Sequence, residues 1–262
     1  MRVDNPSISA VVPTCDRPET VKQAISSILE QTVVPNEIIV VDNGTQRVDE
    51  LAFPREVTFI RLRPYAGVSR ARNEGVKLSG SDFVAFLDDD DTWASDYIER
   101  MLAAVSSSAS TTDLLIGRKD RITDGKQVVY KCIENADHLM PRLLYQNHGV
   151  GGQNIVVRRH TFVNIGGYDE NLQNAEDRAL ALDFIAHDSN IICVPEAVAI
   201  MGETADSRLR YRAGQIKDRV YFYCKYSGMM DLGTKVMALL KLVKYVASDV
   251  GRALLRLSNI RS

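Results

Sequence analysis

The first 110 residues alternate short apolar runs with segments in which apolar residues recur every three or four positions. Four runs rich in β-branched residues predict buried strands, at 8–12, 38–41, 57–62 and 83–87. Helical spacing predicts amphipathic helices from Asp16 or Arg17 to Leu29, over 68–78 and over 97–105. Continuous apolar strands that alternate with helices predict an α/β fold with a mostly parallel central sheet flanked by helices.

The pattern is less regular in the second half of the chain. A Ser/Thr/Ala-rich stretch at 106–112 is expected to be a loop, and Asp124-Gly125 a turn. The remaining apolar segments predict strands at 114–117 and 154–157 and a helix at 139–145.

The end of the chain has a helical pattern of its own. Apolar residues recur at intervals of four and three, at Val236, Leu240, Val243, Ala247, Val250, Leu254 and Leu257. Lys and Arg dominate the polar positions, which predicts an amphipathic helix with a basic polar face. Three roles remain open for it: packing on the rest of the chain, pairing with a second copy, and docking on an anionic membrane surface.

Composition narrows the class of protein. The 262 residues are 45% hydrophobic and 25% charged, as in an ordinary globular protein, and the net charge of −2 gives no reason to expect a nucleic-acid partner. The four cysteines are scattered and form no C-x-x-C pair, which favours a reducing compartment. No apolar run approaches the ~20 residues that span a bilayer. We therefore expect a cytoplasmic protein, at most peripheral on the inner face of the cytoplasmic membrane.

Carboxylates follow several of the predicted strands directly. Asp42 ends the second run, and the four residues Asp88 to Asp91 follow the fourth. In open α/β sheets ligands bind beyond the carboxyl ends of the strands. Packed carboxylates repel one another unless a cation intervenes, and Mg²⁺ binds through one or two carboxylates together with substrate phosphates. The alternative is a solvated acidic turn that caps the next helix.

Five segments in order resemble one known family. They are 11–14 with Arg17, 37–45 (EIIVVDNGT), 67–75 (GVSRARNEG), 86–91 (FLDDDD) and 166–172 (GGYDENL) followed by Glu176-Asp177. The fourth looks like the D-x-D motif of GT-A fold glycosyltransferases, and the set resembles family 2, whose members invert the sugar. The resemblance covers about residues 7 to 205. One departure is Asn43, where many members carry a second Asp, and this bears on the nucleotide preference.

The resemblance implies roles for particular residues. Asp177 matches the general base, with Glu176 in reserve, and Asp90 matches the metal ligand for Mn²⁺ or Mg²⁺. Asp42 would accept a hydrogen bond from the nucleobase, and Asp88 would bind the ribose. Arg72 would support the nucleotide pocket, or it would be only a cation on the helix surface. The residues expected to bind the nucleotide-sugar are Pro13, Thr14, Asp16, Arg17, Asp42, Arg72, Asp88 and Asp89. A further metal ligand in some members falls near Met201-Gly202-Glu203.

These roles imply transfer of a sugar from a nucleotide-sugar, most commonly a UDP-sugar, to an acceptor hydroxyl with inversion. The acceptor would be a sugar or a lipid-linked glycan, in cell-surface polysaccharide or glycolipid synthesis. Residues 1–205 would form the catalytic domain, with a nucleotide-binding half at 1–110 and an acceptor-binding half at 111–205, and 206–262 a helical extension. That extension would contact a membrane surface or form a homodimer. The Q-x-x-R-W signature of processive synthases is absent after Asp177, so one sugar per encounter is expected.

Two other functions fit parts of the sequence. Asp88-x-Asp90-x-Thr92 after an apolar strand matches the nucleophile motif of haloacid-dehalogenase-type Mg²⁺-dependent phosphatases, although those carry it near the chain start. A sugar-nucleotide-binding module without catalysis is the other alternative, and an intact set of Asp88, Asp90 and Asp177 argues against it.

Overall fold

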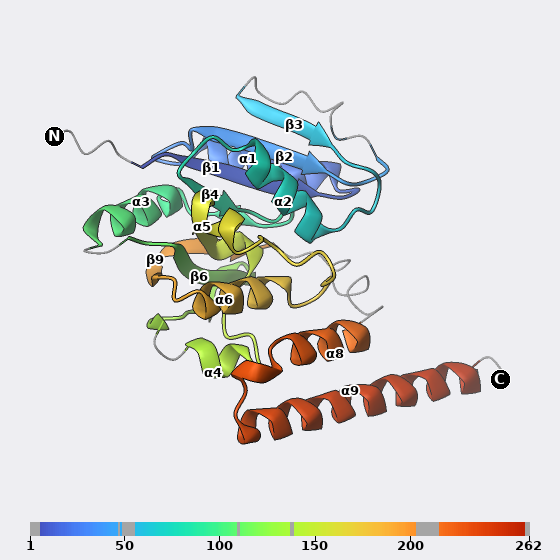
Figure 1. Ribbon diagram of the computed structural model, residues 1–262. Coiled ribbons are helices and arrows are strands. Elements are labelled where there is room, and N and C mark those ends of the chain that lie inside the picture. Colours follow the sequence, from blue (N-terminus) through green and yellow to red (C-terminus); the bar gives the residue numbers. More distant parts are fainter. Residues whose placement is uncertain are drawn as a thin grey trace.

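The computed structural model describes residues 6–46, 48, 56–108, 111–136, 139–202 and 215–259. One mixed sheet runs through both halves of the chain in the order β3-β2-β1-β4-β8-β6-β9-β5, with β7 paired to β6 (Figure 1). The strands are β1 (Ile8–Thr14), β2 (Glu37–Asp42), β3 (Val57–Arg61), β4 (Phe83–Phe86), β5 (Thr92–Trp93), β6 (Leu114–Thr123), β7 (Lys126–Lys131), β8 (Ile155–Arg158) and β9 (Ile191–Met201).

The strands of the first half are parallel, as the sequence predicts. β1 pairs in parallel with both β2 and β4, and β2 with β3. β8 is antiparallel to both β4 and β6, and so joins the two halves, while β6 and β9 are again parallel. The carboxyl ends of β1, β2 and β4 therefore meet at one edge of the sheet.

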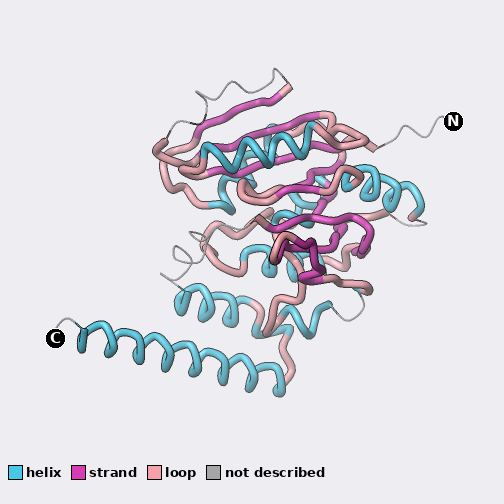
Figure 2. The backbone as a smooth tube through the Cα atoms, turned by 180° about the vertical axis from the view of Figure 1, so that it is seen from behind, coloured by secondary structure: helices cyan, strands magenta, loops and turns pink. Residues whose placement is uncertain are grey.

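Helices cover both faces of the sheet because successive strand residues point to opposite sides. Val12 faces a core that includes α1 (Pro18–Leu29) and α3 (Tyr97–Ser107). Val11 faces the core on the other side, which includes α2 (Val68–Leu78), α5 (Arg159–Asn164) and α6 (Glu176–Ala186). Figure 2 shows the sheet and its covering helices from the opposite side to Figure 1.

A glycine brings α2 close to the sheet. A Cβ at Gly75 would overlap the Val11 side chain, so only glycine lets the helix pack at this distance from β1. The close approach places the Arg72 side of α2 over the carboxyl ends of the central strands, where the candidate site lies.

The last helices lie on the side of the molecule away from β3 (Figure 1). α4 (Leu139–Leu143) and α8 (Gln215–Lys225) contribute Leu143 and Phe222 to the core that contains α6, and Tyr226, directly after α8, joins them. Short 3-10 helices occupy Gly152–Asn154 and Ser227–Met229. α9 (Leu232–Asn259) runs beside α8 at the edge of the molecule. Within the described ranges, no helix combines the length and apolar character that a bilayer span requires.

Most predicted elements of the first half are confirmed to within two residues, and α2 has the predicted bounds. The turn at Asp124-Gly125 is confirmed, with φ of 51° and 71°. The predicted loop at 106–112 begins later than expected, since α3 extends to Ser107. The prediction contained no strand at β5, β7 or β9 and no helix at α5, and it included α8 only within the helical extension expected at 206–262. β5 has only two residues and β7 is largely exposed, so neither gives a run of buried apolar residues. All four cysteines are free.

Candidate active site

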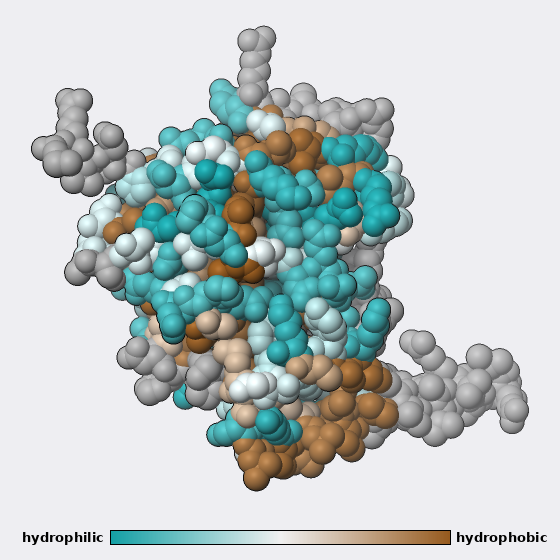
Figure 3. Space-filling view, in the orientation of Figure 1, coloured by the Kyte–Doolittle hydropathy of each residue, from teal (hydrophilic) through white to brown (hydrophobic). Residues whose placement is uncertain are grey.

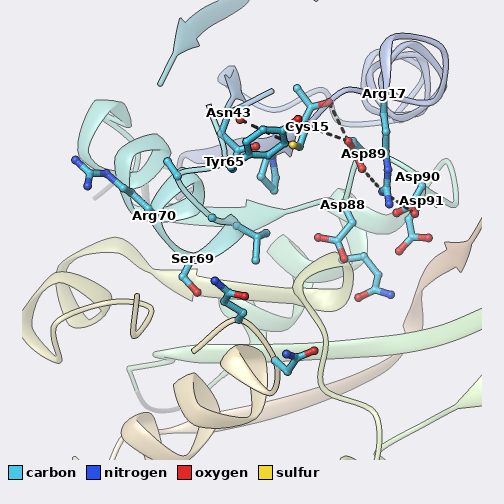
Figure 4. A pocket seen from close by; sticks show the side chains of 18 of the residues that line it. Cys15, Arg17, Asn43, Tyr65, Ser69, Arg70, Asp88, Asp89, Asp90 and Asp91 are labelled. Atoms are coloured by element: carbon cyan, nitrogen blue, oxygen red, sulfur yellow. Dashed lines mark hydrogen bonds and ion pairs between the residues drawn. The ribbon is translucent and has the colours of Figure 1, made fainter. Parts of the chain in front are cut away.

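A cleft of about 810 Å³ lies beyond the carboxyl ends of β1 and β4. Its walls come from the segment after β1, the start of α2, the acidic turn after β4, the loop at 170–174 and the end of β9. Pro13, Thr14 and Arg17 line it, together with Asp88 to Asp91, as Figure 4 shows for the labelled residues. The sequence therefore predicted the contributions of the β1 and β4 ends to the cleft but not that of β9.

Three carboxylates of the acidic turn have partners in the segment after β1 or at the end of β9, and two of them share Arg17. Asp89 accepts hydrogen bonds from Thr14 Oγ1 at 2.8 Å and from Arg17 Nη1 at 2.7 Å. The same Arg17 nitrogen lies 2.8 Å from Asp90 Oδ2. Asp91 accepts from the backbone N–H of Gly202 at 2.9 Å and thereby ties the turn to the end of β9. The turn is thus an ordered structure with internal partners, unlike the solvated acidic turn considered as an alternative.

Burial governs the ionisation of two of these groups. Burial raises the pKa of Asp89 to about 6, with the Asp90 charge adding to the rise and Arg17 opposing it. Burial also raises the pKa of Asp91 well above its ordinary value, and the charges of Asp88 and Asp90 reinforce the shift. A cation at this turn would stabilise the charged forms of both groups.

Arg72 joins the acidic turn to the start of α6. Its Nη2 donates to Asp88 Oδ1 at 2.6 Å, and its Nη1 donates to Asp177 Oδ1 at 3.1 Å. Glu176 Oε1 lies 3.5 Å from the same Nη1, and the guanidinium carbon lies 4.9 Å from the centre of the Tyr168 ring. The side chain is only 2% exposed, so the helix-surface role considered for it is wrong.

Gly152 makes room for this arrangement. A Cβ at Gly152 would overlap Arg72 Nη2 and lie 2.9 Å from Asp88 Oδ1. The backbone N–H of Gly152 also hydrogen-bonds the Asp177 carboxylate. The glycine-rich segment therefore lets the backbone approach the charged cluster closely.

Asp177 and Glu176 stand in the first turn of α6, after Ala175 with a φ of 69°. Burial raises the pKa of Asp177, an effect that Arg72 opposes and the Asp88 charge reinforces. Burial and the neighbouring Asp177 raise the pKa of Glu176 to about 8. The two neighbouring carboxyl groups titrate as a pair, and burial raises the pKa of both.

Comparison with known proteins decides the family. The sequence profile described as "Glycosyl transferase family 2" matches residues 9–165, which is more than half of the chain. The chain belongs to this family.

Individual relatives and solved structures agree with the family assignment. An uncharacterized glycosyltransferase of Haemophilus influenzae is 28% identical over 70% of this chain and 63% of that protein. The Escherichia coli protein WfgD, a UDP-Glc:alpha-D-GlcNAc-diphosphoundecaprenol beta-1,3-glucosyltransferase, is 27% identical over 60% of this chain and 62% of its own. The chain thus spans less than two thirds of each. TarS residues 1–349 of S. aureus, crystallised with UDP-GlcNAc, share the fold, with a TM-score of 0.69 and 18% identity over 92% of this chain and 73% of that one.

Three residues predicted to bind the nucleotide-sugar, Asp16, Asp42 and Arg72, do not line the cleft of this family 2 protein. Asp16 accepts hydrogen bonds from the backbone N–H groups of Thr45 and Gln46, at 2.6 and 2.8 Å, and so holds the segment after β2. Asp42 is 0% exposed, accepts from the Gly44 N–H at 2.8 Å and lies 3.5 Å from Arg61 Nη1. Their contacts organise the wall of the cleft, whereas the neighbouring Asn43 lines it.

Arg72, Glu176 and Asp177 also lie outside the lining residues, behind Asp88. The side chain of Asp177 is partly exposed, while Arg72 and Glu176 are buried. The role of Arg72 is therefore to bridge the two carboxylate groups in this conformation.

Sequence reasoning missed two residues of this cluster. Tyr168 donates from its hydroxyl to Asp177 Oδ1 at 3.3 Å. Lys119 of β6 is buried, and burial lowers its pKa while the charges of Asp177, Asp88 and Asp91 oppose the shift. Lys119 lies beyond the strand predicted at 114–117, among the charged residues Arg118 to Arg121, so the sequence pattern gave no signal for it.

The acidic turn offers carboxylates that could bind a metal ion. Among the residues that the structure describes, no three His, Cys, Asp or Glu side chains converge so that they alone would hold a metal ion. Mg²⁺ and its analogues need only one or two carboxylates when a diphosphate supplies further oxygens. Asp90 lies on the cleft wall and is the candidate ligand, with Arg17 Nη1 at 2.8 Å from its Oδ2, while Asp91 accepts from the Gly202 N–H. Glu203 lies outside the described residues.

Proposed function

We propose that this protein transfers a sugar from a nucleotide-sugar donor, a UDP-sugar in the first instance, to an acceptor hydroxyl with inversion at the sugar. The observation that carries the proposal is the Arg72 bridge, which links Asp88 on the cleft wall to Asp177 at the start of α6. A carboxylate on the cleft wall and a candidate base behind it are thereby held at fixed positions relative to each other. The phosphatase alternative leaves Asp177 without a role and belongs to a different family.

Asp177 is proposed as the general base. In a single displacement the acceptor oxygen bonds to the anomeric carbon, the bond to the diphosphate breaks on the opposite side, and the hydroxyl proton passes to the base. The raised pKa of Asp177 makes this carboxylate a stronger proton acceptor than an exposed Asp. Arg72 and the Tyr168 hydroxyl orient it.

A divalent cation, Mn²⁺ or Mg²⁺, is proposed to bind at Asp90 together with the donor diphosphate. When bound, the ion supplies charge stabilisation for the departing diphosphate. Arg17, which contacts both Asp89 and Asp90 from the cleft wall, is placed to approach the same phosphates.

The acceptor is proposed to be a sugar or a lipid-linked glycan of cell-surface polysaccharide or glycolipid synthesis. Support for the acceptor comes from WfgD, which is named for a sugar on diphosphoundecaprenol, and support for a UDP-sugar donor comes from the TarS complex with UDP-GlcNAc.

The test compares Asp177→Asn with the unchanged protein. Transfer from UDP-sugars to a panel of glycan acceptors should fall by about 10² or more, because the acceptor proton loses its base. UDP binding, measured by calorimetry with Mn²⁺, should stay close to that of the unchanged protein. Asp96→Asn on the opposite side of the sheet, where Asp96 pairs with Arg100, is the matched control and should transfer normally.

The metal is tested separately. Asp90→Ala should abolish the effect of Mn²⁺ on UDP binding, and a chelator should stop transfer by the unchanged protein. Full transfer by Asp177→Asn would refute the base, and metal-independent transfer would refute the cation. Binding of UDP-sugars without turnover on any acceptor would instead identify a binding module.

A further inference from the structure

The outward face of α9 is apolar over the length for which its side chains are described, up to Val246. Leu232 is 79% exposed, and Leu239, Leu240 and Val243 are 57–61% exposed. The other exposed members of this outward face are Val236 and Val246. Figure 3 shows apolar surface gathered along α9. A contiguous exposed apolar face of this kind marks a surface that another body covers.

The opposite side of α9 holds the helix on the protein. Ala238 is buried in the core that contains α6, and Lys241 Nζ donates to the carbonyl of Tyr145 at 3.0 Å. The Arg219 guanidinium of α8 lies 3.6 Å from the centre of the Tyr245 ring. These contacts fix the orientation of α9, so the apolar face is directed away from the protein by its own packing.

The apolar residues of the four-and-three repeat lie on this outward face. Val236, Leu240 and Val243 are the first members of the four-and-three repeat that continues to Leu257 in the sequence. α9 therefore packs on the rest of the protein through residues outside the four-and-three repeat. The repeat itself remains available for one of the other two roles that the sequence left open.

Basic residues border the outward face on both sides. At 100° per residue, Lys235 and Lys244 fall on opposite flanks of the arc centred near Val243, and both are exposed. The segment from Leu232 to Val246 contains no Asp or Glu. In a pair of such helices, positive flanks would meet without an acidic partner. Lysines beside a broad apolar face instead fit a surface of phosphate headgroups over acyl chains.

We propose that the outward face of α9 docks on an anionic lipid bilayer, with its apolar residues at the acyl boundary and Lys235 and Lys244 at the headgroups. The inference goes beyond the proposed reaction and does not depend on it. The catalytic cluster lies on other elements, so failure of one proposal leaves the other standing.

The test is co-sedimentation of the full chain with vesicles. We expect binding to vesicles of phosphatidylglycerol and phosphatidylcholine, weak binding to phosphatidylcholine alone, and loss of binding at high salt. Leu239→Gln with Val243→Gln should abolish binding, since Gln keeps helix propensity while removing the apolar face. Lys235→Gln with Lys244→Gln should weaken it about twentyfold, at roughly fivefold for each lysine near the surface.

Val163→Gln on α5 is the matched control, because Val163 is an equally exposed apolar residue away from α9. It should bind vesicles normally. Circular dichroism verifies that each variant folds, and donor turnover with a water-soluble acceptor should be unchanged in the α9 variants. Failure to bind anionic vesicles, equal binding to neutral ones, or full binding by the Gln variants would overturn the proposal. The proposal would also be overturned if the protein does not bind vesicles but forms a dimer in light scattering, and if Leu239→Gln with Val243→Gln dissociates that dimer.

Discussion

Replacement of Arg72 by Met tests the central electrostatic contact of the site. The substitution keeps an unbranched apolar stem but removes the guanidinium that lies 2.6 Å from Asp88, 3.1 Å from Asp177 and 3.5 Å from Glu176. Removing one partner of a buried ion pair costs about 3–5 kcal/mol, and the partial exposure of Asp88 and Asp177 places this variant near the lower end of that range. We expect a loss of that size in the free energy of unfolding at about pH 8.

The loss of unfolding free energy in Arg72→Met should be smaller at lower pH. Burial raises the pKa of Asp177 and Arg72 opposes the rise, so the variant should have a higher pKa still at this carboxyl. Above the ordinary pKa of Asp, the variant's native state then keeps a proton that its unfolded state has released. Its stability therefore increases as the pH falls, by up to about 1.4 kcal/mol per pH unit for one proton. The deficit relative to the unchanged protein should shrink between about pH 8 and about pH 5.5.

Urea unfolding at these two pH values measures both quantities. When Arg72→Met is made in the Asp177→Asn background, the loss of unfolding free energy should be smaller than in the unchanged background, because the neutral amide does not need the guanidinium. Arg100→Met is the control, since Arg100 pairs with Asp96 at the exposed surface of α3. A deficit below about 1 kcal/mol at the higher pH, or one that does not change with pH, would refute this account of Arg72.

Three further substitutions test neighbouring parts of the structure. Gly152→Ala should lower the transfer rate by about tenfold or more without unfolding the protein, because the new methyl group displaces Arg72 from Asp88. Circular dichroism checks the fold and steady-state kinetics the rate. An unchanged rate would contradict the tight approach of Gly152 to Arg72. Lys119→Met removes a cation that holds down the pKa of Asp177, so the acidic limb of the pH–rate profile should move to higher pH, and a profile without that movement would contradict the placement of Lys119. For Glu37, burial acts to raise the pKa, but hydrogen bonds from Ser9, Gly80, Ser81 and Ser79 outweigh it and lower the pKa below 4.5. Its stabilising effect is present above pH 4.5 and lost as the pH falls through the lowered value, so Glu37→Gln should cost stability in thermal unfolding at about pH 7 and progressively less in acid.

The sequence by itself determined the architecture around the cleft. Apolar runs followed by helical spacing predict the parallel strands of the first half, and the acidic turn after β4 is confirmed at their carboxyl ends. This succeeds because burial on both faces of a strand, or on one side of a helix, imposes a local period. The metal at Asp90 and the nucleotide contacts of Pro13, Thr14 and Arg17 remain predictions.

Only the tertiary structure decided which charged groups meet. Arg72 is one of several basic residues in the α2 segment, and nothing in its spacing indicates that it reaches Asp88 and, 105 positions along the chain, Asp177. Nor does spacing distinguish Asp16 and Asp42, which hold the cleft wall, from Asp89, which lines it. Equally, the four-and-three repeat of α9 identifies an apolar face but not its direction. The physical reason is that long-range partners depend on how elements pack, whereas periodicity records only that a face is apolar.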